Sequence, residues 1–302
     1  MSETIQIPSK APGKSGAASL QQLERIHLQS SSLPNDLNKG LYTYAEDNFQ
    51  YDFIYRPSST RRLFVLLSGY VDRKLLSPPV FQRWSWAKYF PGHSLYIADP
   101  SLNLEANLGL AWYVGTEANY ILPSVAELIL RVAKKIDIPL SDVIIYASSG
   151  GGFAALKLAA LIPEVTSVVI NPQTEITKYD NPGVERFLRT CFNGLTRERA
   201  IEQYRNRLSV FPDIEKLKAR KIIYAQNLID THHINDHFLP FAAQVGLEKE
   251  SSYSNKNIKT IFFENEGGHG KGESPEVFPS LIRHAINISA APLQTFPGET
   301  TG

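Results

Sequence analysis

The segment of the sequence with the clearest chemical meaning is DVIIYASSGGGFAALKLAAL, residues 142–161. An apolar run that is typical of a buried strand leads into Ser149, and a helical stretch of small residues follows it. A serine on such a sharp strand-to-helix turn presents its hydroxyl, and the turn closes only when the residues two positions away are small. Ala147 and Gly151 meet that requirement. The pattern predicts that Ser149 is a nucleophile for acyl transfer.

Other interpretations of this segment are weaker. Ser148 is a poorer nucleophile candidate, because the bulky Tyr146 lies two residues before it. The glycines from Gly150 onward also match a dinucleotide-binding fingerprint, which needs an acidic residue about twenty positions further on. That place holds Asn171, Pro172 and Gln173 instead. A purely structural glycine turn, packing a helix on a strand, is the remaining alternative.

A serine nucleophile needs a general base and a carboxylate that orients it. His269 lies among glycines in the loop that follows the last expected strand, Ile258–Phe263. Asp230 follows the strand before it, so the chain order is serine, acid, histidine, as in α/β enzymes with a nucleophile elbow. Asp236 is the competing acid, although an N-cap role before the next helical stretch also explains it.

The segment 230–237 also invites a metal interpretation. Asp230, His233, Asp236 and His237 all carry side chains that bind metal ions. Their spacing matches no standard zinc pattern, so we expect no metal. His233 is instead a candidate for contact with the substrate beside the catalytic residues.

The tetrahedral intermediate of acyl transfer needs two N–H donors for its oxyanion. The backbone N–H of Gly150, directly after the nucleophile, is the first candidate. The second is the N–H of Tyr70, in the Ser68-Gly69-Tyr70 turn after an earlier strand. Arg83 and Trp84 lie a little further along and are candidates for binding a sugar or an anionic acyl group.

Alternating strand-like and helical stretches predict the fold that must position these residues. The expected strands are Tyr51–Tyr55, Arg62–Leu67, Ser94–Ala98, Asp142–Tyr146, Thr166–Ile170, Lys221–Ala225 and Ile258–Phe263. Several are continuous apolar runs, as in a parallel sheet that is covered on both faces. The pattern predicts a doubly wound, mostly parallel α/β sheet. Residues 174–215 exceed what one crossover needs and are expected to form a helical cap.

Composition limits the classes of function. The 302 residues carry a net charge of +1, so no basic excess favours a nucleic-acid partner. The apolar runs are too short to span a bilayer. Cys191 is the single cysteine and excludes an intramolecular disulfide. These features favour a cytoplasmic protein, while its oligomeric state is not predicted. We expect a flexible extension over residues 1–40, an α/β domain over 41–290 and a flexible tail over 291–302.

From Leu63 to about His284 the chain resembles the α/β-hydrolase superfamily, through its elbow, its late acid and its last-loop histidine. It departs from the usual pattern with Ala147 in place of a glycine and with Ser68-Gly69 in place of His-Gly. The SSGGGFAAL and INPQTEI segments are similar to hydrolase-like proteins of bacterial surface-glycan synthesis. That narrower resemblance implies a carbohydrate acceptor and an acyl donor such as acetyl-CoA; otherwise no cofactor is expected.

Three functions are compatible with these features. The first is a serine hydrolase that cleaves a polar or carbohydrate-linked acyl ester. The second is a polysaccharide O-acetyltransferase that uses the same residues but passes the acyl group to a sugar hydroxyl. The third is a non-catalytic member of the fold that binds a glycan or a protein.

Overall fold

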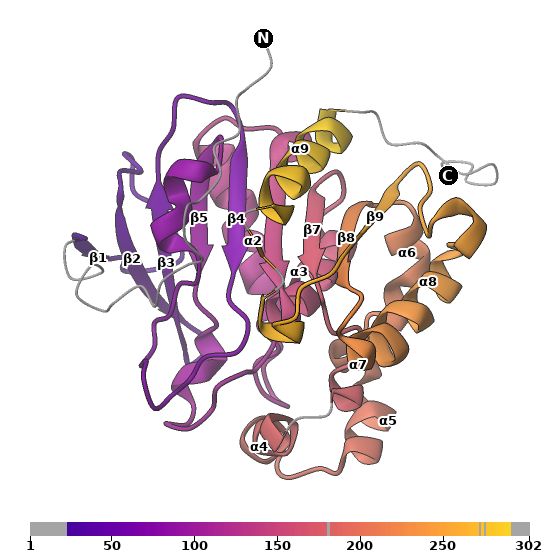
Figure 1. Cartoon of the computed structure of the whole chain (residues 1–302). Helices are drawn as coiled ribbons and strands as arrows, with labels where there is room; N and C mark the ends of the chain where they lie inside the picture. The colour runs from indigo at the N-terminus through magenta and orange to yellow at the C-terminus, as the bar shows by residue number, and fades with distance from the viewer. Residues whose placement is uncertain (1–22, 180–181, 272, 275, 291–302) are drawn as a thin grey trace, which may run out of the picture.

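The structure is a computed structural model that describes residues 23–179, 182–271, 273–274 and 276–290. Within these residues a nine-stranded sheet forms the centre, with the strand order β1-β2-β3-β5-β4-β6-β7-β8-β9 (Figure 1). The strands are β1 (Arg25–His27), β2 (Gly40–Glu46), β3 (Phe49–Arg56), β4 (Leu63–Leu67), β5 (His93–Ile97), β6 (Val143–Ser148), β7 (Thr166–Ile170), β8 (Lys221–Asn227) and β9 (Ile258–Phe263).

Strands β4 to β9 all run parallel, and the antiparallel pairs β2–β3 and β3–β5 lie toward the N-terminal edge. This arrangement confirms the predicted mostly parallel sheet. Because β4, β6, β7, β8 and β9 are parallel, their carboxyl ends share one edge. Ligands bind at that edge in open α/β sheets.

Helices cover both faces of the sheet (Figure 1). The longer ones are α2 (Leu122–Lys135), α3 (Ser149–Leu161), α4 (Pro182–Cys191), α5 (Arg197–Leu208) and α9 (Val277–Ala290), and the shorter ones are α6 (Ile214–Lys218), α7 (Thr231–His233) and α8 (Leu239–Val245). Short 3-10 segments include η1 (Trp84–Tyr89), η4 (Ile176–Lys178) and η8 (Gly268–Lys271), and Ile234–Phe238 forms a π-helical turn. Among the described residues, no helix is long and apolar enough to cross a membrane.

Two hydrophobic cores follow from the two covered faces. The larger core joins α2, α3 and α8 to one face, and the smaller joins η1 and α9 to the other. Helix α2 has apolar residues at helical spacing and buries that side only. Helix α3 is different, because every residue from Ser149 to Ala160 is buried. Its small side chains let it pack closely against the sheet.

The N-terminal part of the sheet departs from the sequence prediction. Strand β2 was not expected, and β1 lies inside the predicted extension 1–40, where Arg25 pairs with Leu41 in parallel register. The sheet therefore begins before residue 40. Residues 1–22 and the predicted tail 291–302 lie outside the described residues. The segment between β7 and β8 contains α4 and α5, which lie beyond the carboxyl edge of the sheet (Figure 1).

Candidate active site

Ser149 stands on the sharp turn between β6 and α3. Its φ is +55°, a left-handed conformation that is uncommon for a non-glycine residue and that costs backbone strain. The glycines after it allow close packing. A Cβ on Gly150 would lie 2.5 Å from Leu110 Cδ1, and one on Gly151 would lie 2.9 Å from the Ser68 carbonyl oxygen. The sequence pattern at the elbow thus corresponds to contacts that only glycine permits.

His269 and Asp230 meet Ser149 at the carboxyl edge of the sheet. The Ser149 hydroxyl lies 2.7 Å from His269 Nε2, and His269 Nδ1 lies 3.0 Å from Asp230 Oδ2. Ser149 and Asp230 are each 9% exposed and so are largely screened from bulk water, whereas the His269 side chain is 28% exposed. The three side chains come from the ends of β6 and β8 and from η8, and the fold brings them into one hydrogen-bonded row.

Asp230 is the N-cap of α7, where its side chain accepts the His233 N–H. Burial alone would raise the pKa of this carboxyl. Hydrogen bonds from His233 and His269 outweigh burial and hold the pKa well below its usual range. The competing acid, Asp236, instead pairs with His232 at 2.9 Å and is half exposed. Asp236 was expected to be an N-cap, but it lies inside the π-helical turn Ile234–Phe238, and the N-cap of the preceding helix α7 is Asp230.

The side chain of Asn227, the last residue of β8, holds the loop that carries His269 through hydrogen bonds to its backbone. The Asn227 amide donates to the carbonyls of Asn265 and Gly268 at 2.8 and 3.0 Å. Its Oδ1 accepts from the N–H groups of Asn265 and Ile229. Asn227 is fully buried. This role was not predicted from the sequence, where the one signal for it is an amide side chain just after a predicted apolar strand.

Two further side chains, which lie 60 residues apart, complete the hydrogen bonds around the serine. The Gln173 amide nitrogen lies 3.1 Å from Ser149 Oγ and 3.0 Å from His233 Nε2. On its other side, His233 Nδ1 lies 3.1 and 3.0 Å from the two oxygens of Asp230. The rings of His233 and His269 stack with centroids 4.0 Å apart. His233 was predicted to touch substrate, but it is 1% exposed and fully engaged here. The sequence analysis gave Gln173 no role.

The turn after β4 also lies against the serine. A Cβ on Gly69 would lie 3.4 Å from Ser149 Cβ, so the two segments are in close contact. Gln82 holds this turn with both ends of its amide: Oε1 accepts the Gly69 N–H at 3.0 Å, and Nε2 donates to the Tyr70 carbonyl at 2.9 Å. Tyr70 itself is 55% exposed. The Gly69 N–H is therefore already hydrogen-bonded within the protein, and the Tyr70 carbonyl is fixed by the same Gln82 amide.

The geometry argues against a substrate contact for Arg83. Its side chain is 3% exposed, and Nε donates to both carboxylate oxygens of Glu273 at 2.7 and 2.9 Å. The remaining nitrogens donate to the Leu67 carbonyl and the Ser148 hydroxyl. Arg83 therefore joins the ends of β4 and β6 to the segment after His269. Trp84, the other candidate, packs its ring against the Arg56 guanidinium at 5.8 Å.

A metal interpretation of these residues is disfavoured by their hydrogen bonds. Asp230, His233 and His269 have ligand atoms within 4.8 Å of one another. Both imidazole Nδ1 atoms, however, face Asp230, and His233 Nε2 faces the Gln173 amide N–H. A metal at Nδ1 would move the His233 proton to Nε2, where two N–H donors would oppose each other.

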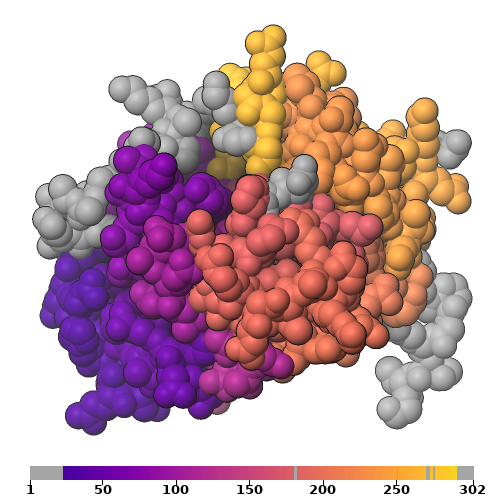
Figure 2. Space-filling view, turned by 90° about the horizontal axis from the view of Figure 1, so that it is seen from below, coloured from indigo at the N-terminus to yellow at the C-terminus, as the bar shows by residue number. Residues whose placement is uncertain are grey.

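The insertion between β7 and β8 lies over this side of the molecule. Figure 2 views that side, and the segment that contains α4 and α5, in salmon, covers the middle of the face. Within this insertion and before α4, the Tyr179 ring lies 6.2 Å from the His269 ring and 6.4 Å from the Trp112 ring. The predicted cap region thus contributes an aromatic side chain next to the candidate base.

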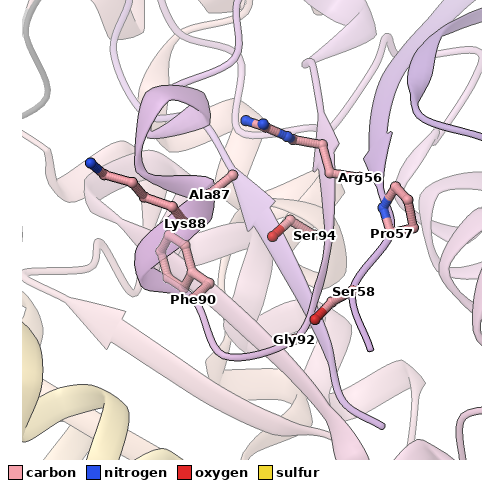
Figure 3. Close-up of a pocket in the computed structure, with 8 residues that line it drawn as sticks. All are labelled: Arg56, Pro57, Ser58, Ala87, Lys88, Phe90, Gly92 and Ser94. Atoms are coloured by element: carbon pink, nitrogen blue, oxygen red, sulfur yellow. The ribbon is translucent and has the colours of Figure 1, made fainter. Parts of the chain in front are cut away.

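A separate pocket of about 250 Å³ opens at the other edge of the sheet (Figure 3). Its lining includes Ser94 at the amino end of β5 and its pairing partner Arg56 in β3. Of its eight lining residues, the charged ones are Arg56 and Lys88. Since Ser149 follows the carboxyl end of β6, this pocket is remote from the candidate active site.

Comparisons with known proteins agree with this architecture. No family model matches the sequence, and no curated protein sequence matches it. Among solved structures, the capsule O-acetyltransferase of Neisseria meningitidis serogroup A is similar, with a TM-score of 0.58 and 14% identity over 85% of this chain and 97% of that chain. A mutant of that enzyme in complex with CoA gives a TM-score of 0.57 at 14% identity over 83% of this chain and 95% of that chain. The acylaminoacyl peptidase of Pyrococcus horikoshii gives 0.55 at 14% identity, over 83% of this chain and 40% of that chain. The chain therefore has the α/β-hydrolase fold.

Proposed function

We propose that this protein is a serine-dependent acyl-transfer enzyme in which Ser149, His269 and Asp230 form the catalytic triad. The observation that carries the proposal is the row of hydrogen bonds, 2.7 Å from Ser149 Oγ to His269 Nε2 and 3.0 Å from His269 Nδ1 to Asp230. A second support is the left-handed conformation of Ser149 on its turn. A purely structural glycine turn would need neither the serine nor the aligned histidine.

The chemistry follows from these positions. Ser149 Oγ attacks the acyl carbon while its proton passes to His269 Nε2, and the ionised Asp230 stabilises the imidazolium. The oxyanion accepts hydrogen bonds from the N–H groups of Gly150 and Tyr70. We assign the second donor to Tyr70 because the Gly69 N–H is already bonded to Gln82. Collapse of the intermediate returns the proton from His269 to the leaving group and leaves an acyl-enzyme.

The first candidate reaction is hydrolysis of a polar or carbohydrate-linked ester, in which water attacks the acyl-enzyme. Transfer of an acetyl group from acetyl-CoA to a sugar hydroxyl is the second. A specific observation favours this alternative: the similarity to the Neisseria capsule O-acetyltransferase extends over 85% of this chain and 97% of that one. The first half-reaction is the same in both cases.

A fluorophosphonate probe tests the triad, because it reacts with activated serines irrespective of the natural acyl group. Intact-mass analysis should give one adduct on the wild type, no adduct on Ser149→Ala and a much slower reaction on His269→Ala. Ser148→Ala is the matched control and should still be labelled, because its hydroxyl bonds to Arg83 and not to His269. An unlabelled wild type, with a control hydrolase labelled in parallel, would refute the proposal and favour a binding protein of this fold.

A second experiment separates the two acceptors. The protein is incubated with acetyl-CoA or p-nitrophenyl acetate, with and without methyl glycosides as acceptor alcohols. Release of acetate at a rate that glycosides do not change supports hydrolysis. Acetylated glycoside, detected by mass spectrometry and absent with Ser149→Ala, supports transfer.

A further inference from the structure

The row of hydrogen bonds in the triad continues beyond Asp230 and returns to Ser149, so that the bonds form a closed ring. Starting at Ser149, they run through His269 to Asp230, then to His233, then to Gln173, and return to Ser149. His233 and Gln173 are 1% and 0% exposed, so water does not compete for these bonds. A triad alone would use only the first two of these five hydrogen bonds.

One residue outside the ring fixes the positions of its protons. The Trp112 indole nitrogen is a donor only, and it lies 3.2 Å from Gln173 Oε1. Gln173 must therefore turn its NH₂ group toward Ser149 and His233. That leaves His233 Nε2 as an acceptor, so the proton of the neutral ring sits on Nδ1 and points at Asp230. Burial lowers the pKa of His233, which keeps the ring in this neutral form.

We propose that Gln173 and His233 are positioning residues for the triad, acting on Ser149 from one side and on Asp230 from the other. The inference rests on the proposed function. One Gln173 N–H donates to Ser149 Oγ and directs the serine proton toward His269. The His233 Nδ1–H lies 3.1 and 3.0 Å from the two oxygens of Asp230, and the second of these, Oδ2, is also the oxygen that faces His269. Asp230 is then held ionised, in one orientation, by two imidazoles.

The surroundings of His269 set the expected pH dependence. The titratable groups that face it are Asp230, His233 and Tyr179, and the rings of His232 and His237 in turn contact the His233 ring. Without the His233 N–H, the whole charge of Asp230 acts on His269. We expect reaction of this variant with the probe to be lost at a higher pH than in the wild type.

The test combines the fluorophosphonate rate with its pH profile. His233→Phe keeps an aromatic ring for stacking but removes both hydrogen bonds, and it should slow labelling by about 100-fold, as for a misplaced catalytic group. The acid limb of its profile should move to higher pH. His233→Asn keeps an N–H close to Asp230 and should restore part of the rate. Gln173→Met removes the donors at similar volume and should also slow labelling.

His237→Phe is the matched control. His237 is a fully buried histidine in the same cluster, and burial lowers its pKa to about 2. It accepts the Thr174 N–H and makes no hydrogen bond to Asp230. This variant loses a buried imidazole too, but its acid limb should stay where that of the wild type lies. A purely structural role for His233 would instead give the two Phe variants the same profile.

NMR of ¹⁵N-labelled imidazoles provides a measurement that needs no turnover. Because burial lowers its pKa, we expect His233 to be the neutral Nδ1–H tautomer at pH 7, and to lose that fixed tautomer in Gln173→Met. An Nε2–H tautomer in the wild type, or unchanged spectra and labelling rates in Gln173→Met, would overturn the inference. If the wild type shows the expected tautomer but Ser149 is not labelled, the proposed function fails and the hydrogen-bonded ring stands.

Discussion

The buried ion pair between Arg83 and Glu273 gives a prediction that the structure makes quantitative. Both side chains are largely buried, at 3% and 11% exposed. Two opposite charges about 4 Å apart at an effective dielectric constant near 20 attract by about 4 kcal/mol. Glu273→Gln keeps the shape but leaves the guanidinium without its counter-charge. Breaking such a pair costs about 3–5 kcal/mol, and we expect that loss in the free energy of unfolding.

Urea denaturation at neutral pH measures this difference, and the exposed pair of Arg61 and Asp137 supplies the control. Those side chains are 73% and 96% exposed, so Asp137→Asn should change stability by less than about 1 kcal/mol. Because Glu273 lies four residues after His269, the fluorophosphonate rate of Glu273→Gln should fall as well. If Glu273→Gln loses no more stability than Asp137→Asn, the ion pair of Arg83 does not hold the ends of β4 and β6 to the segment after His269.

Three further results are expected. Asp230→Asn should slow labelling by about 10³- to 10⁴-fold, because the amide carries no charge to stabilise the imidazolium and turns an NH₂ toward one of its N–H donors, whereas Asp236→Asn should stay within about two-fold of the wild type; equal losses would contradict the choice of acid. Since the pKa of Asp230 is lowered in the folded state, its ionisation stabilises the fold above its unfolded pKa of about 4 and less so below it. The difference in unfolding free energy between wild type and Asp230→Asn should therefore shrink as the pH falls below about 4, and a constant difference would rule this out. Gly151→Ala should destabilise the protein by about 1–3 kcal/mol, since its Cβ would lie 2.9 Å from the Ser68 carbonyl; thermal unfolding at an unchanged midpoint would count against that contact.

Features with a local physical cause could be predicted from the sequence. The elbow is one, because a buried strand, a strained serine and small neighbours must occur within a few residues. The positions of Asp230 and His269 are another, because each follows a strand whose apolar run is clear. Both side chains lie beside Ser149 in the structure. Their catalytic roles remain the proposal made above.

Features that depend on distant partners could not be predicted. Arg83 looked available for a substrate, because nothing nearby in the chain shows that Glu273, 190 residues later, neutralises it. Gln173 and His233 likewise come within hydrogen-bond distance only because β7 and β8 pair side by side in the sheet. Strand β1 has three residues and pairs at the sheet edge, too little for an apolar pattern to appear.

Helix α3 links the nucleophile to the most protected part of the molecule. Its first twelve residues are buried, so no partial opening can release the Ser149 turn without exposing the sheet beneath it. Amide hydrogen exchange in this helix should proceed only through global unfolding. Thermal inactivation and loss of structure should then be one event with one rate, and any ligand that slows unfolding will prolong the working lifetime of the serine.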